Sequence, residues 1–372
     1  MTDTDVRPHE IETTMREIDA EIQKLITARS ARAGSYGPQF VELWTLAVSC
    51  LSGGKLLRPR ILIGAFDALT DTPAPEAASR SVALEIAASL EILHFAFLLH
   101  DDVIDEDLVR RGEPNLVGRL VSIATATQEL TLDRCSAVQR RLHWARSSGL
   151  LVGDLMLTIA HQAFARARVL EERRIRVLDL LDTTVTETVA GEYCDVGLAD
   201  GCINPDLNIV LEMTRMKTAT YTFELPLRIA AVIAGQDQRV EQRLGEVGRH
   251  LGVAFQLQDD LLSAFGVSEA HGKDQFSDFR EGKETALIAY ARKTPMWPNI
   301  EHHMRATNFS DDSGYAIQRL LIECGARTFI ESMIEDQMRA ALDILSQEDG
   351  VLLAPVSRFI LTLVDSLDGR RS

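Results

Sequence analysis

Apolar residues recur at three- and four-residue spacing along most of this chain. That period marks one face of an α-helix, and the alternating β-branched runs that predict strands are nearly absent. Turn signals such as 70–73 and 235–238 fall between the periodic segments. The pattern predicts an all-α protein, with helices over residues 9–29, 38–50, 58–70, 76–100, 148–168, 171–197, 206–234, 238–265, 281–292, 311–323, 325–346 and 350–367.

One stretch, residues 112–147, departs from this rhythm. It is polar, has mixed helical character and contains Arg140, Arg141 and Arg146. No Pro/Ser-rich linker and no internal repeat divides the chain. We therefore expect one all-α domain over residues 1–372, with an insertion or mobile excursion at 112–147.

The longest apolar stretch, Val82 to Leu99, contains Glu85, Glu91 and His94. Charged residues inside a membrane span are costly, so the stretch predicts a buried core helix and no stable membrane insertion. The first residues lack a basic segment followed by an apolar one, so we expect no signal peptide.

The composition of the chain indicates a globular protein and argues against some kinds of binding partner. Of the 372 residues, 46% are hydrophobic, which allows a sizeable core. The net charge of −16 argues against a nucleic-acid partner. The five cysteines, in no metal-binding spacing, indicate reduced thiols and a cytoplasmic protein; they are Cys50, Cys135, Cys194, Cys202 and Cys324.

The main candidate chemistry is a cluster of aspartates, Asp101, Asp102 and Asp105, at the end of an apolar run. Asp101 and Asp105 are four residues apart and share a helix face, where two like charges repel unless a cation lies between them. Magnesium suits such a site because it prefers hard oxygen ligands and keeps positions for water and phosphate. The alternative is a solvated acidic helix end, which the apolar residues before Asp101 disfavour.

A second pair, Asp259 and Asp260, also lies among apolar residues such as Leu257 and Leu261. Carboxylates beside apolar helix faces are costly without a partner. Two such clusters facing each other would hold several divalent cations, and those cations would hold a diphosphate.

Basic residues accompany both clusters. Arg110 and Arg111 follow the first, either as ordinary surface pairing or as guanidinium forks for phosphate. Lys55 and Arg58 lie where Pro59 is expected to begin a helix, a favourable place for an anion, although the spacing is not that of a nucleotide-binding loop.

Three later lysines, Lys217, Lys273 and Lys283, also lie near acidic residues. Half-buried lysines usually need an anionic partner. Taken singly, each is more typical of a structural residue.

Together these motifs resemble the trans-isoprenyl diphosphate synthases, the polyprenyl synthetase family. The resemblance runs from about residue 50 to 290 through GGKLLRP, HFAFLLHDDVIDEDLVRRG, GDLML, KTA, FQLQDD and GKDQFSDFREGKET, in that order. It implies an isoprenoid-synthase-type helical bundle around a central cavity, normally a homodimer. It also implies a magnesium-dependent prenyltransferase that condenses an allylic diphosphate with isopentenyl diphosphate, with three magnesium ions per active site.

The resemblance assigns roles to individual residues. Asp101 and Asp105 would bind magnesium with support from Asp102, and Asp259 would bind a further ion with Asp260 beside it. The expected ligands of the allylic diphosphate are Arg110, Lys217, Lys273 and Lys283. Those of isopentenyl diphosphate are Lys55, Arg58, His94 and Arg111. Thr218 and Gln256 match positions that line the reacting centre.

The sequence departs from the family pattern at two positions. Ser263 replaces the third aspartate of the second motif, which puts the affinity for the third metal in doubt. Glu192 stands where the family commonly has glutamine.

Ser263 also fits the metal motif of class I terpene cyclases, but Val267 lies where that motif has glutamate, and a cyclase needs no second diphosphate site. A non-catalytic subunit is disfavoured because both acidic clusters and both basic sets are present.

Product length depends on the residues four and five places before Asp101, which form part of the cavity floor in the family. These are Phe97 and Ala96. Alanine permits a chain longer than fifteen carbons and Phe97 limits very long ones, so we predict geranylgeranyl diphosphate, with farnesyl or longer products as alternatives.

Two non-enzymatic explanations are disfavoured. An acidic calcium-binding scaffold would not need the basic motifs, and the sequence lacks the sustained heptads of a coiled coil.

Overall fold

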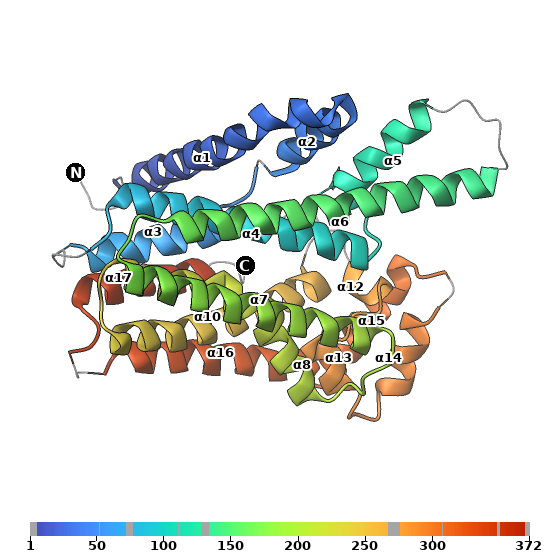
Figure 1. Cartoon of the computed structure of the whole chain (residues 1–372). Helices are drawn as coiled ribbons and strands as arrows, with labels where there is room; N and C mark the ends of the chain where they lie inside the picture. The colour runs from blue at the N-terminus through green and yellow to red at the C-terminus, as the bar shows by residue number, and fades with distance from the viewer. Residues whose placement is uncertain are drawn as a thin grey trace. The chain divides into compact units, whose positions relative to one another are not determined.

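The structure is a computed structural model in which residues 6–51, 53–71, 77–110, 112–127, 134–266, 276–306, 308–347 and 350–368 are described. Their secondary structure is almost entirely helical, as Figure 1 shows. The exception among these residues is a small antiparallel hairpin, β1 (Val109–Arg110) and β2 (Glu113–Pro114), in which Val109 pairs with Pro114. The prediction of an all-α protein is confirmed.

The contacts divide the chain into two compact units. Unit 1 comprises Met1–Ile63 and Ala78–Leu178, and unit 2 comprises Gly64–Ala77 and Asp179–Ser372. Two helices, α3 (Leu57–Leu69) and α7 (Glu171–Ala199), run through the boundaries between them. The single domain over 1–372 stays a prediction.

Unit 1 is built around α4 (Arg80–Ile104), which packs along α6 (Arg134–Arg166) and against α1 (Val6–Ala33). The other helices wholly within this unit are η1 (Gly34–Tyr36), α2 (Pro38–Leu51) and α5 (Leu116–Thr127), and it also contains the hairpin β1–β2. Among the described helices, α4 is the one long and apolar enough to cross a membrane, and 83% of its most apolar window is buried within the protein. It therefore has the burial of the core helix that its sequence predicted.

Unit 2 is built around α10 (Gln238–Phe265). This helix packs against η2 (Arg215–Glu224), α9 (Leu225–Ile233) and α16 (Ala326–Leu345). The other elements are α8 (Leu207–Thr214), α12 (Ser277–Arg280), α13 (Ala286–Ala291), α14 (Trp297–Met304), α15 (Asp311–Glu323) and α17 (Ala354–Asp368).

Most predicted helices appear within a few residues of their expected bounds, and α15 and α10 begin and end where predicted. The described part of 112–147 is regular: it forms β2, α5 and the first turns of α6, which begins at residue 134 rather than 148. Whether this segment is an insertion stays a prediction. The predicted helix 206–234 is continuous but contains η2, a ten-residue π-helix that the periodicity did not indicate.

Candidate active site

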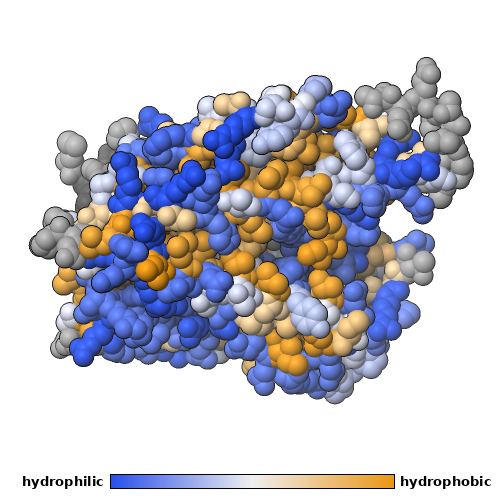
Figure 2. Space-filling model, in the orientation of Figure 1, coloured by the Kyte–Doolittle hydropathy of each residue, from blue (hydrophilic) through white to orange (hydrophobic). Residues whose placement is uncertain are grey.

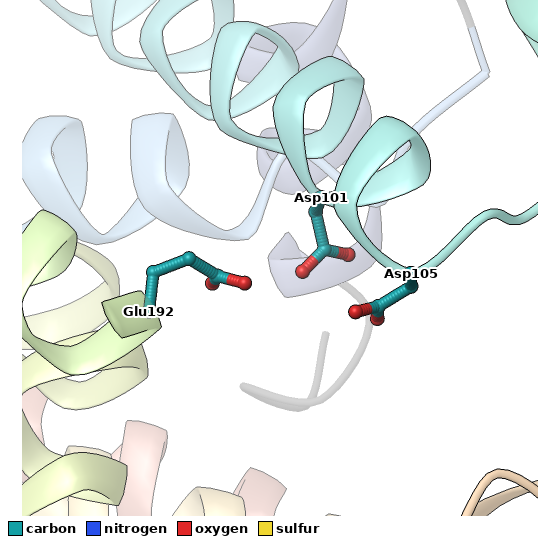
Figure 3. Close-up of side chains that lie close together, drawn as sticks. All are labelled: Asp101, Asp105 and Glu192. Atoms are coloured by element: carbon teal, nitrogen blue, oxygen red, sulfur yellow. The ribbon is translucent and has the colours of Figure 1, made fainter. Parts of the chain in front are cut away.

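The first aspartate cluster lies at the end of α4. His94, Asp101 and Asp105 follow one another at intervals of seven and four residues, so they share one face of the helix. A carboxylate oxygen of Asp101 and one of Asp105 lie within 4.8 Å of each other, and both side chains are half-buried. Figure 3 shows both carboxylates projecting from the end of this helix. The pair fits a divalent cation because two hard anionic ligands are already close together and remain accessible.

Asp102, between these two residues in the sequence, is buried, with 3% of its surface exposed. The Arg110 guanidinium holds it: Nε donates to Asp102 Oδ1 at 2.8 Å, and Nη2 donates to Asp101 Oδ2 at 2.8 Å. Burial raises the pKa of Asp102 to about 6, while the Arg110 charge and hydrogen bonds oppose that rise. The Asp102 carboxylate is thus a structural partner of Arg110, which it fixes beside Asp101.

Tight packing positions the end of α4. Gly153 of α6 leaves room for the His100 ring, since a Cβ there would lie 2.4 Å from His100 Nε2. His100 Nε2 in turn lies 3.3 Å from Asp154 Oδ1. Gly112, with φ of +77°, permits the turn of the hairpin that carries Arg110. Small residues therefore let the hairpin and α6 approach the cluster closely.

The residues expected to bind isopentenyl diphosphate also belong to unit 1. Helix α3 begins at Leu57, so Lys55 precedes it and Arg58 lies in its first turn, as predicted. Lys55 is exposed, Arg58 is half-buried, and His94 is buried at 8% exposure. Free backbone N–H groups at a helix start, together with these cations, suit a phosphate. Arg111 lies outside the described residues.

The two residues expected to form the cavity floor lie on α4, in the turn before Asp101. Ala96 is completely buried, whereas Phe97 is half-buried. They lie five and four residues before Asp101 on the same helix. Their backbone positions relative to the aspartates are therefore fixed by α4 itself.

The second aspartate cluster lies on α10 in unit 2. Asp259 is half-buried, whereas Asp260 is 8% exposed and accepts a hydrogen bond from Gln256 Nε2 at 2.9 Å. Ser263 is 6% exposed, and its Oγ is buried without a hydrogen-bond partner among the described residues. This cluster thus presents one accessible carboxylate, on Asp259, where the first presents two.

Lys217 and Thr218 lie on η2, and backbone contacts hold this π-helix on two sides. A Cβ on Gly191 of α7 would lie 2.4 Å from the Lys217 backbone N, and one on Gly252 of α10 would lie 2.6 Å from Ala219 Cα. Neither position has space for a larger residue without separating the helices. Pro226 at the start of α9 cannot donate a hydrogen bond, which favours a departure from α-helical geometry in the preceding turn.

The Lys217 ammonium forms two ion pairs with α7. Its Nζ lies 2.9 Å from Glu192 Oε2 and 2.6 Å from Asp195 Oδ2. Figure 3 includes Glu192, whose side chain projects from α7. Asp195 was not among the residues predicted from the sequence to bind substrate or metal, although its spacing of three residues from Glu192 places both on one helix face.

Of the last two predicted lysines, Lys283 is described and precedes α13 (Ala286–Ala291). Lys283 is half-buried, and its Nζ lies 3.0 Å from Glu281 Oε2. Lys273 lies outside the described residues, as does Val267, on which the comparison with terpene cyclases depended.

The comparisons with known proteins show the family and the class of enzyme. The family model for polyprenyl synthetases matches residues 43–315, well over half of the chain. The chain belongs to the polyprenyl synthetase family. It is a trans-prenyltransferase of that family, and the predicted class of enzyme is confirmed.

Similar proteins carry names from one reaction class. The chain is 31% identical over 303 residues to a geranylfarnesyl diphosphate synthase of Aeropyrum pernix, covering 81% of this chain and 85% of that one. It is 26% identical over 315 residues to a geranylgeranyl diphosphate synthase of Methanosarcina mazei, covering 84% and 86%.

The fold is similar to that of solved members of the same class. A geranylgeranyl pyrophosphate synthase of Corynebacterium glutamicum, solved in complex with isoprenyl diphosphate and magnesium, matches with a TM-score of 0.83 and 26% identity, covering 96% of this chain and 98% of that one. The helical prenyl-synthase fold expected from the sequence is therefore confirmed.

Proposed function

We propose that this enzyme condenses isopentenyl diphosphate with an allylic diphosphate to give geranylgeranyl diphosphate. The observation that carries the proposal is the end of α4, where the Asp101 and Asp105 carboxylates share one face and the Arg110 guanidinium bridges Asp101 and Asp102. This arrangement combines ligands for a divalent cation with a cation fixed beside them. The similar proteins from A. pernix and M. mazei, named for products of different length, support the reaction class and leave the product to be measured.

We further propose that the bound cations are magnesium, three per active site. Asp101 and Asp105, supported by Asp102, would hold them from α4, and Asp259, with Asp260 beside it, would hold one from α10. When bound, the ions neutralise the negative charge that develops on a departing diphosphate.

The side chains of the protein supply the remaining functions. Arg110, Lys217 and Lys283 would bind the allylic diphosphate together with Lys273, and their positive charges favour its release as an anion. Lys55, Arg58 and His94, with Arg111, would orient isopentenyl diphosphate for attack by its alkene. Thr218 and Gln256 would line the reacting centre, and we assign no side chain as the base.

Product length should depend on Phe97 and Ala96. Ala96 is fully buried on α4 and is expected to lie at the cavity floor, where a larger side chain would shorten the space available to the growing chain. We expect Ala96→Phe to give farnesyl diphosphate and Phe97→Ala to give longer products than the parent enzyme. An unchanged product from either variant would remove that residue from the cavity floor.

The test of function is a product assay. The enzyme is incubated with radiolabelled isopentenyl diphosphate, magnesium and each allylic primer in turn, and the dephosphorylated products are separated by chromatography. We expect a dominant twenty-carbon product and no turnover in EDTA. A dominant product of thirty or more carbons would contradict the geranylgeranyl assignment, and a cyclic hydrocarbon would favour the cyclase.

We also propose that the enzyme is a homodimer. Apolar side chains are exposed along α6, among them Val138, Trp144, Leu150 and Leu151, and Figure 2 shows apolar surface over this helix. Several large apolar side chains exposed on one helix are typical of a protein–protein interface. Sedimentation equilibrium should give twice the mass of the chain, 41.2 kDa, and Leu151→Asp should shift the protein towards the monomer.

A further inference from the structure

Two carboxylates of α7 surround the Lys217 ammonium of η2. Its Nζ lies 2.9 Å from Glu192 and 2.6 Å from Asp195, and all three side chains are about one-fifth exposed, between 17% and 20%. The group carries one positive and two negative charges. With glutamine at position 192, as the family commonly has, the same group would be neutral. This chain therefore has one additional negative charge beside a lysine that we expect to bind diphosphate.

The backbone keeps Glu192 at this place. Its neighbour Gly191 contacts the Lys217 backbone so closely that a Cβ would lie 2.4 Å from the Lys217 N. One turn earlier on α7, Glu187 Oε2 accepts from Arg215 Nη1 at 3.1 Å and from Thr220 Oγ1 at 2.8 Å. These contacts hold η2 against α7 on both sides of Lys217, so the Lys217 backbone stays beside Glu192 while the two helices are packed.

We propose that Glu192 is a positioning residue that makes diphosphate binding at Lys217 depend on a divalent cation. The inference rests on the proposed role of Lys217 as a ligand of the allylic diphosphate. A diphosphate without metal carries several negative charges and meets a group whose net charge is also negative. A diphosphate that arrives with magnesium carries less charge and is repelled less. Removal of the Glu192 charge should thus strengthen diphosphate binding more without magnesium than with it.

The test measures binding of inorganic diphosphate by calorimetry, in EDTA and at saturating magnesium, for the full-length protein and Glu192→Gln. In EDTA we expect the variant to bind about tenfold more tightly than the parent, as removal of one like charge at close range predicts. With saturating magnesium we expect the two affinities to agree within about twofold. The increase in affinity that magnesium causes would then be about tenfold smaller in the variant.

Two further variants separate charge from structure. Glu192→Asp keeps the charge and should keep the metal dependence of the parent. Glu212→Gln removes a carboxylate that pairs with Arg215 at 3.1 Å and is 65% exposed, and it should also behave as the parent. Thermal unfolding of each variant checks that the fold is intact.

The proposal is overturned if Glu192→Gln and the parent show the same dependence on magnesium, if the variant binds more weakly in both conditions, or if neither protein binds diphosphate. The product assay distinguishes this failure from failure of the proposed function. If the parent enzyme forms the condensation product but Glu192→Gln does not show the expected change in affinity, only the proposed role of Glu192 is contradicted. If the affinity changes as expected but the parent enzyme forms no product, the proposed reaction is contradicted.

Discussion

The two aspartate motifs differ in what surrounds them. On α4, Asp101 and Asp105 present two carboxylates, and Arg110 binds Asp101 and the buried Asp102. On α10, Asp259 has no second accessible carboxylate on its face, because Ser263 replaces one and Asp260 accepts from Gln256. The first motif thus has two accessible carboxylates, whereas the second has one, on a helix whose backbone is closely packed.

The second motif, which has fewer accessible carboxylates, has the more rigid surroundings. Near the first motif, Gly153 contacts the ring of His100, a side chain that can rotate. Near the second, Gly252 contacts the backbone of Ala219, which cannot move without η2. The number of accessible carboxylates and the rigidity of the supporting helix are thus separate properties, and each can be tested by substitution.

The largest expected effect is at Asp101. Asp101→Ala removes half of the carboxylate pair and one partner of Arg110, so we expect kcat to fall by about 10³-fold. Steady-state kinetics at saturating magnesium measures the loss. Glu12→Ala on α1, an exposed residue paired with Arg16, is the control and should keep full activity. A loss under tenfold at Asp101 would remove it from the metal site.

A smaller loss is expected at the second motif. Asp259→Ala removes the one accessible carboxylate of its cluster, and we expect kcat to fall by about 10²-fold with a higher magnesium requirement. Asp336→Ala on α16, a 62% exposed residue, serves as the control. If Asp259→Ala proves more damaging than Asp101→Ala, the order of importance of the two motifs is reversed.

The packing contrast predicts a difference in stability. Gly252→Ala brings a methyl group against backbone, and we expect it to lower the free energy of unfolding by about 3 kcal/mol. Gly153→Ala meets a side chain that can turn away, and alanine favours a helix, so we expect a loss of about 1 kcal/mol. Denaturant titration of both variants gives the comparison, and equal losses would contradict it.

The smallest effect is expected from restoring the third aspartate. Ser263→Asp adds a ligand to the poorer motif, and we expect the magnesium concentration for half-maximal rate to fall about threefold. Because Ser263 is 6% exposed, the added carboxylate should also destabilise the metal-free protein. Ser263→Asn, of similar size without the charge, is the matched control. A magnesium requirement that is the same in both variants would show that position 263 does not reach the metal.

Much of this molecule could be predicted from its sequence. The period of the apolar residues gave the helices, because burial of one helix face requires that spacing; α10 and α15 were predicted to the residue. The spacing of Asp101 and Asp105 likewise determined that they share a face of α4. The start of α3 beside Lys55 and Arg58 followed from Pro59, whose fixed φ suits a first helical turn.

Tertiary structure alone decided the rest. The π-helix of η2 is continuous in sequence with its neighbours, and it is held by glycines on two other helices, which no local pattern shows. Asp102 looks like Asp101 and Asp105 in the sequence, but in the fold Asp102 is buried whereas the other two are half-buried. The pairing of Lys217 with Glu192 and Asp195 joins residues more than twenty positions apart. Local sequence determines helix faces, whereas the partner of each charge depends on which helices meet.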